Sequence, residues 1–115
     1  VALQGLEFAH MGLNNDGVEE AEKSVTGFAA LGMPTKRGAS STFMGPFIEV
    51  LPKLYLGKNG HIGFRCFDIE RTLAYLAKLG FTVNKETIAR DAKGTIKVCY
   101  LNEDLSGFAI HLIRA

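Results

Sequence analysis

The feature that most constrains how this chain folds is an internal repeat. The order His, apolar, Gly, apolar occurs at residues 10–13 and again at residues 61–64. Each copy is followed by a polar break and by a helical pattern that ends in Leu-Gly, at 31–32 and at 79–80. The two copies divide the 115 residues nearly in half. Two matching units predict a duplicated supersecondary element and not a solenoid, because a solenoid needs at least three repeats.

The helical segments of the repeat are predicted at 16–31 and 69–79. In both, apolar residues recur at three- and four-residue spacing, which gives each helix one apolar stripe. Asp16 or Asn15 is expected to cap the first helix and Asp68 the second, because a short polar side chain accepts a hydrogen bond from the free N–H groups of a first turn. The glycine at the end of each copy then stops the helix.

Strands are predicted around these helices from apolar runs bounded by turn residues. They cover 6–13, 34–38, 41–44, 46–51, 60–67, 81–90, 95–101 and 107–114. Each half then has the order βαβββ. We therefore predict an α+β fold of two tandem βαβββ modules, at about 6–55 and about 60–115, within a single domain spanning 1–115. A chain of this length can bury one core but not two independent ones.

The charge balance argues against some classes of partner. Thirteen Lys and Arg stand against twelve Asp and Glu, a formal net charge of +1. There is thus no electrostatic reason to expect nucleic acid or an anionic membrane as a partner. No run of about 18 apolar residues occurs, and no basic stretch followed by an apolar block opens the chain. We expect a cytoplasmic protein in which Cys66 and Cys99 are buried, reduced thiols.

Only three histidines occur, and the repeat relates each of them to another metal-capable residue. His10 and His61 are equivalent in the first strand of each half, and aligning the last strands of the two halves places Glu49 opposite His111. Successive residues of a strand point to opposite faces, and in this alternation all four side chains point away from the helices. If the sheet curves they meet in one cleft, where imidazole and carboxylate groups suit Zn, Ni, Fe, Mn or Co. The alternative is that each histidine is an ordinary hydrogen-bonded core or surface residue.

Two cations are candidates for binding a substrate in this cleft. Arg65 is expected on the cleft face of its strand, and Lys97 on the same face of a neighbouring strand, where together they would anchor a carboxylate or a phosphate. The alternative, favoured for Lys97, is a solvated charge at a strand end. Cys99 is a further residue that could face the cleft, with no base beside it. Gly12 and Gly63 are expected to permit close packing, since no glycine-rich nucleotide loop is present.

One stretch of the second half resembles the opening of a module of the vicinal oxygen chelate superfamily, which contains glyoxalases, bleomycin-resistance proteins and dioxygenases. It runs from His61-Ile62-Gly63-Phe64 through Asp68-Ile69-Glu70-Arg71 to Gly80-Phe81. In the first half, Ile48-Glu49-Val50-Leu51 resembles the closing strand that carries the family's metal-binding Glu. The resemblance spans about positions 6–114. It implies a cup-shaped mixed sheet, formed by paired modules around a divalent metal that binds vicinal oxygens of a substrate.

Carried over by position, the resemblance implies a metal set of His10, Glu49, His61 and His111. His10 and His61 match the family's first-strand ligands, and Glu49 matches its first closing-strand ligand and is the catalytic candidate. His111 departs from the Glu that is usual at its position. The change keeps a ligand but removes a negative charge, which leaves the identity of the metal open. It also removes a carboxylate base from that position.

A narrower resemblance concerns residues 6–22 and 55–61. These stretches make the chain similar to the glyoxalase-like domain fused to some bacterial 2-keto-3-deoxy-6-phosphogluconate/4-hydroxy-2-oxoglutarate aldolases. A (β/α)₈ barrel needs about 200 residues or more, so an aldolase activity would belong to another part of a longer protein.

The resemblance implies a metal-dependent enzyme that acts on a small 2-oxo or hydroxy acid, by lyase or isomerase chemistry through an enolate-like intermediate. One alternative is a non-catalytic module that binds a sugar acid and regulates a fused aldolase. Another is a dimerisation module whose histidines have no chemical role. Modules of this type complete their cups by pairing within or between chains, so a homodimer is expected.

Overall fold

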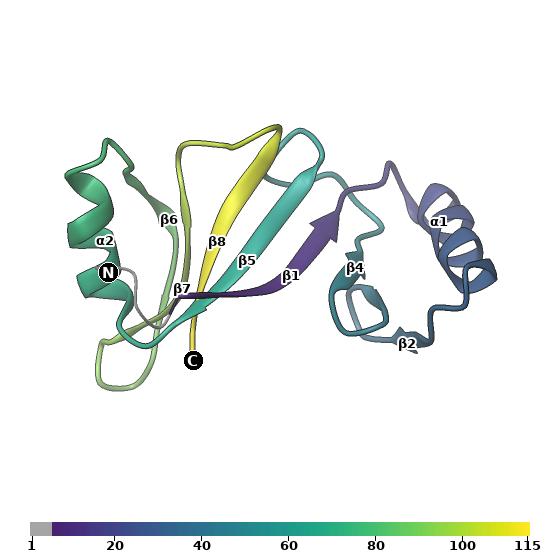
Figure 1. The fold of residues 1–115 in the computed structure, drawn as a ribbon, viewed down its shortest axis with the longest axis horizontal. Helices are drawn as coiled ribbons and strands as arrows, with labels where there is room; N and C mark the ends of the chain where they lie inside the picture. Colours follow the sequence, from purple (N-terminus) through teal and green to yellow (C-terminus); the bar gives the residue numbers. More distant parts are fainter. Residues whose placement is uncertain (1–5) are drawn as a thin grey trace.

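The computed structural model describes residues 6–115, and in this range eight strands form one sheet that carries two helices (Figure 1). The first half contains β1 (Glu7–Leu13), α1 (Val18–Ala30), β2 (Thr35–Arg37), β3 (Thr42–Met44) and β4 (Ile48–Val50). The second half contains β5 (Gly60–Cys66), α2 (Ile69–Ala77), β6 (Val83–Arg90), β7 (Ile96–Leu101) and β8 (Phe108–Arg114). Each element falls inside the segment predicted for it, and the α+β, βαβββ-βαβββ fold is confirmed.

The order of the strands shows the duplication directly. The sheet runs β2-β3-β4-β1-β5-β8-β7-β6, so the two halves meet where β1 pairs with β5. β1 is parallel to β4, and β5 is parallel to β8, whereas the central pair β1–β5 is antiparallel. In Figure 1 these central strands cross the middle of the molecule, and α1 and α2 lie at its opposite ends. Equivalent strands of the two halves are therefore brought side by side at the centre.

The start of α2 follows the prediction and the start of α1 does not. The Asp68 carboxylate accepts a hydrogen bond of 3.1 Å from the backbone N–H of Arg71, as expected for a cap. α1 instead begins after Gly17, whose φ of 101° is a conformation that favours glycine, and no side chain caps it. No helix among residues 6–115 is both long enough and apolar enough to cross a membrane.

Asn15, one of the two predicted caps of α1, has a different role. Its side chain is buried, and its amide donates to the backbone oxygen of Leu51 at 3.0 Å and accepts from the Ser24 hydroxyl at 3.1 Å. The side chain thus ties the end of β1 to the residue after β4 and to the middle of α1. Asp16, the other predicted cap, caps nothing, and its own N–H donates to the Glu20 carboxylate.

Two hydrophobic clusters lie between the sheet and its helices, one in each half. α2 covers the larger cluster, which contains Cys66, Cys99 and Leu112. α1 covers a smaller one formed by Ala21, Val25, Met44 and Val50. The chain length predicted a single core. The structure has two clusters instead, and both pack on one continuous sheet. Both cysteines are free and buried, as predicted, and burial raises the pKa of Cys99 to about 11.

Candidate metal centre

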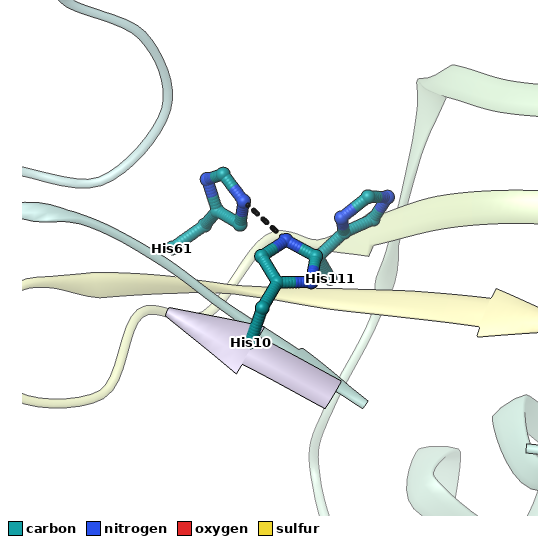
Figure 2. Close-up of side chains that lie close together, drawn as sticks. All are labelled: His10, His61 and His111. Carbon is teal, nitrogen blue, oxygen red and sulfur yellow. Dashed lines mark hydrogen bonds between the residues drawn. The ribbon is translucent and has the colours of Figure 1, made fainter. Parts of the chain in front are cut away.

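The side chains of three histidines lie close together over the central strands of the sheet (Figure 2). His10 comes from β1, His61 from β5 and His111 from β8, and one ring nitrogen of each lies within 4.8 Å of the others. The Nε2 atoms of His10 and His61 are 3.0 Å apart. The ring of His111 has its centroid 5.6 Å from that of His61 and 6.2 Å from that of His10. Residues far apart in the sequence thus present their nitrogen atoms to one small volume.

Each of the first two histidines lies across a glycine of the neighbouring strand. The register of the antiparallel β1–β5 pair places His10 opposite Gly63 and His61 opposite Gly12. A Cβ atom on Gly12 would lie 2.1 Å from Cε1 of His61, and one on Gly63 would lie 2.7 Å from Cε1 of His10. The two glycines therefore provide the space in which the rings turn toward each other. The predicted close packing at Gly12 and Gly63 is confirmed, and the His-apolar-Gly repeat has a structural cause.

A bulge in β1 turns His10 toward the other histidines. Phe8 pairs with Phe64, but His10 pairs with Gly63, so Ala9 is an extra residue between the two pairs. Phe8 and Phe64 are in edge-on contact, with centroids 6.5 Å apart, and Phe64 packs against the α2 cluster. Without the extra residue, strand alternation would point His10 to that same face.

Glu49, the fourth predicted ligand, lies beside the histidines. It is opposite Gly12 in the β1–β4 pair, so Glu49, Gly12 and His61 form one row across three strands. Its Oε1 atom lies 3.4 Å from Nε2 of His10 and 3.3 Å from Nε2 of His61. Its Oε2 atom accepts a hydrogen bond of 2.6 Å from the Ser41 hydroxyl, a length typical of a strong bond to a carboxylate. The carboxylate is thus held from both sides.

The protonation states of these groups suit metal ligation at neutral pH. Burial lowers the pKa of His10, and the nearby Glu49 only partly opposes that effect. Burial, reinforced by the other two histidines, lowers the pKa of His111 to about 4. The pKa of Glu49 is lowered chiefly by its hydrogen bond with His61 and further by the bond from Ser41, against the effect of burial. His10 and His111 are therefore neutral and Glu49 is ionised, which are the forms that bind a metal.

The histidine nitrogens pass a simple test of fit to a divalent metal. Within residues 6–115, neither ring nitrogen of His111 has a hydrogen-bond partner, although both are buried, and Nδ1 of His61 is also buried and unpartnered. A buried polar atom without a partner costs about 1–3 kcal/mol. A cation at the meeting point of the three rings would satisfy a nitrogen of His111. The donor set, three imidazoles beside a carboxylate, is one that Zn, Ni, Fe, Mn and Co accept.

A cleft of about 300 Å³ opens over this centre. Besides His10, Glu49, His61 and His111, it is lined by Ser40, Phe43, Leu51, Lys53, Tyr55 and Tyr100. Tyr100 pairs with His111 across β7 and β8, and its ring stacks on the imidazole with centroids 4.2 Å apart and parallel planes. A larger hollow of about 570 Å³ adjoins the cleft at Ser40 and Phe43, but no candidate ligand lines it.

Neither of the predicted substrate-binding cations lines the cleft. Arg65 is on the same face of β5 as Gly63, but its Nε atom donates to the carboxylate of Glu7 at 3.0 Å; the Arg65 side chain is partly exposed and that of Glu7 largely exposed. Its charge still helps to lower the pKa of His10. Lys97 is exposed and does not line the cleft, which agrees with the favoured alternative of a solvated charge.

Tyr100, and not Cys99, is the residue of β7 that faces the cleft. Cys99 pairs with Leu112, which packs against α2, and Tyr100 pairs with His111. Sequence reasoning missed Tyr100, although the pairing of β7 with β8 would have identified it. Ser41, Lys53 and Tyr55 lie outside the regular strands, where periodicity carries no signal of direction.

Comparison with known proteins supports the fold. No protein-family model matches the sequence, and no curated protein matches it. Among solved structures, a hypothetical protein of Bacillus halodurans C-125 has a TM-score of 0.62 at 15% identity, covering 97% of this chain and 96% of that chain. A methylmalonyl-CoA epimerase of Mycobacterium tuberculosis has a TM-score of 0.57 at 14% identity, covering 98% and 89%. The chain therefore has the glyoxalase-like fold over nearly its whole length.

Proposed function

We propose that this protein is a metal-dependent enzyme of the vicinal oxygen chelate type, which acts on a small 2-oxo or hydroxy acid by isomerase or lyase chemistry. The observation that carries the proposal is the meeting of three imidazoles from β1, β5 and β8, beside an ionised carboxylate, in one cleft. The fold shared with an epimerase supports isomerase chemistry. The link to a fused aldolase rests on the sequence resemblance alone.

The residues that would hold the metal are His10, His61 and His111, with Glu49 as the fourth ligand. When bound, a divalent metal supplies a Lewis acid that polarises an oxygen of the substrate. The protein supplies the rest. The two glycines opposite the histidines leave room for the rings, and Ser41 fixes the direction of the Glu49 carboxylate. The walls of the cleft limit the substrate to a small molecule, because about 300 Å³ is at the lower end of ligand-pocket volumes.

Glu49 is also the proposed base. It is the one carboxylate among the described residues that line the cleft. Because its pKa is lowered, it is ionised at neutral pH and can accept a proton from a carbon next to a carbonyl group. Ser41 occupies Oε2, so Oε1 is the atom that would accept the proton, once a substrate oxygen has taken its place as the fourth ligand.

The presence of a single carboxylate favours one second candidate, a module that binds a sugar acid without converting it. Moving a proton from one face of a carbon to the other requires an acid as well as a base. The described residues that line the cleft include no second carboxylate that could act as this acid. In this second candidate the same centre would hold the ligand and regulate an attached enzyme.

Elemental analysis of the purified protein tests the metal centre. We expect about one divalent ion per chain, lost in His61→Ala and retained in Cys99→Ala, whose side chain lies in the α2 cluster. The absence of a bound metal in the wild type, even after incubation with each candidate ion, would refute the proposal.

Exchange of the proton next to the carbonyl of a 2-oxo acid, followed by NMR in D₂O, tests the chemistry. Glu49→Gln should keep much of the metal and lose the exchange, because an amide retains an oxygen ligand but is not a base. A wild-type protein that binds metal and acid without exchange would leave the binding module as the function.

The assembly and the location stay predictions. A homodimer would be seen by sedimentation velocity at micromolar concentration, and a monomer there would contradict that expectation. A cytoplasmic location would be tested by cell fractionation.

A further inference from the structure

One wall of the cleft is a continuous series of aromatic rings that starts at the metal centre and ends at a cation. Tyr100 stacks on His111 at 4.2 Å, and Tyr55 meets Tyr100 nearly perpendicularly, with centroids 5.8 Å apart. The Nζ atom of Lys53 lies 5.7 Å from the centroid of the Tyr55 ring. All four residues line the same cleft. The cleft therefore has two ends of different chemistry, joined by an apolar surface.

Lys53 is available to bind an anion. Among the described residues that line the cleft it is the only Lys or Arg, and no carboxylate within residues 6–115 lies within 4 Å of its Nζ atom. The carboxylate of the cleft, Glu49, is already held by Ser41 and faces the histidines. The two charges of the cleft thus have separate roles, one at each end.

The backbone around Lys53 is held in place. The amide of Asn14 donates to the backbone oxygens of Tyr55 at 3.2 Å and Gly57 at 3.0 Å, which fastens this loop to the end of β1. Gly57 has a φ of +82°, and a Cβ atom there would lie 2.0 Å from the backbone oxygen of Gly60. The loop is therefore packed directly on the start of β5. Lys53 and Tyr55 are presented by fixed backbone and not by a free segment.

We propose that Lys53 and Tyr55 form an anion subsite, and that the cleft selects 2-oxo or 2-hydroxy acids that carry a second carboxylate. This inference rests on the proposed function, because the first carboxylate and the neighbouring oxygen are assigned to the histidine end. The methylene groups between the two carboxylates lie along Tyr100 and Tyr55, and the second carboxylate pairs with Lys53. One unpaired lysine matches the single charge of a carboxylate better than the double charge of a phosphate, which usually collects several donors.

The test compares two acids that differ only at the far end. 2-Hydroxyglutarate has a carboxylate where 2-hydroxypentanoate has a methyl group, and this one difference lies away from the end assigned to the histidines. Binding of both to the metal-loaded protein is measured by isothermal titration calorimetry. We expect the diacid to bind roughly two- to five-fold more tightly, the range for an exposed ion pair. Lys53→Gln should abolish this preference and leave the affinity for the monoacid unchanged, whereas Lys53→Arg should keep it.

Lys58→Gln is the matched control, because Lys58 is in the same loop, is exposed and does not line the cleft. Equal loss of the preference in Lys53→Gln and Lys58→Gln would overturn the subsite, since it would show only a general effect of charge. A preference that survives Lys53→Gln would overturn it as well. Tighter binding of 3-phosphoglycerate than of 2-hydroxyglutarate would show that the subsite prefers a phosphate to a carboxylate, and would refute the proposed class of acid.

The same measurements separate this inference from the proposed function. If His61→Ala loses the metal and binds both acids more weakly, while the wild type shows no preference for the diacid, the metal centre stands and the Lys53 subsite is refuted. If the preference for the diacid depends on Lys53 but His61→Ala changes the affinity for neither acid, the subsite stands and the metal-dependent function is refuted. If neither acid binds the metal-loaded protein, both are refuted.

Discussion

Gly12→Ala is the substitution for which the structure gives the sharpest expectation. The added methyl group would lie 2.1 Å from Cε1, 2.5 Å from Nδ1 and 2.6 Å from Nε2 of His61. Carbon atoms in contact are separated by about 3.5 Å or more, so the ring would have to withdraw by about 1.4 Å. His61 is only 4% exposed, which leaves little space for that movement.

Two quantities should change in Gly12→Ala. Overpacking of this kind costs about 1–3 kcal/mol in the free energy of unfolding. A metal ligand must sit within about 0.2 Å of its ideal distance, so a withdrawal of that size removes His61 from the metal. Changes in residues that only support a ligand already weaken binding about 10- to 100-fold, and we therefore expect a loss of about 100-fold or more. Gly63→Ala should do the same more weakly, because its Cβ would lie 2.7 Å from His10, a more exposed ring.

Competition with a chelator of known affinity measures the metal affinity, and urea unfolding of the metal-free protein measures the stability. Gly27→Ala is the control, because Gly27 is inside α1 and a Cβ atom there meets nothing within 4 Å. It should leave metal affinity unchanged and stabilise the helix by about 0.5–1 kcal/mol. A folded Gly12→Ala protein with wild-type metal affinity would refute the assignment of His61 as a ligand positioned by this glycine.

Three further predictions follow from contacts at and around the centre. Ser41→Ala removes the 2.6 Å hydrogen bond to Glu49, so the pKa of Glu49 should rise and metal affinity should fall about 10-fold or more, by titration and chelator competition. Burial holds the pKa of His111 near 4 in the folded protein, below its ordinary 6.5. As pH falls, the unfolded chain therefore becomes protonated at this histidine before the folded protein does. The free energy of unfolding of metal-free protein should therefore decrease by up to about 3 kcal/mol as pH falls from 6.5 to 4, and His111→Gln should flatten that decrease in urea titrations. Asn15→Ala leaves the buried oxygen of Leu51 without its partner, and calorimetry should show a loss of about 1–3 kcal/mol of stability with little change in metal affinity.

Local signals in the sequence were sufficient for the elements and their order. The apolar periodicity of 16–31 and 69–79 predicted both helices, and Asp68 was correctly identified as a cap because capping involves only neighbouring residues. The repeat predicted that the two halves are equivalent, and the strand order confirms it. The structure adds that β1 lies beside β5, so His10 and His61, equivalent in the repeat, are close together.

Features that depend on long-range pairing had to come from the tertiary structure. Glycines at 12 and 63 were visible in the sequence, but only the β1–β5 register shows that each lies under the histidine of the other strand. The bulge at Ala9, which turns His10 into the cleft, has no local signature. The face of each residue of β7 was not visible either, because only the pairing of β7 with β8 shows that Tyr100, and not Cys99, lies on the face of His111.

The surroundings of the candidate ligands were also decided by the fold. Ser41 reaches Glu49 because β3 pairs with β4, and Tyr100 covers His111 because β7 pairs with β8. Asn15 looked like a helix cap in sequence, yet its burial between β1, β4 and α1 gives it stronger partners. The sequence by itself determined which side chains can bind a metal and on which strands they lie. Which groups stand beside them was determined by strand register, because a shift of one residue turns every side chain of a strand to the other face.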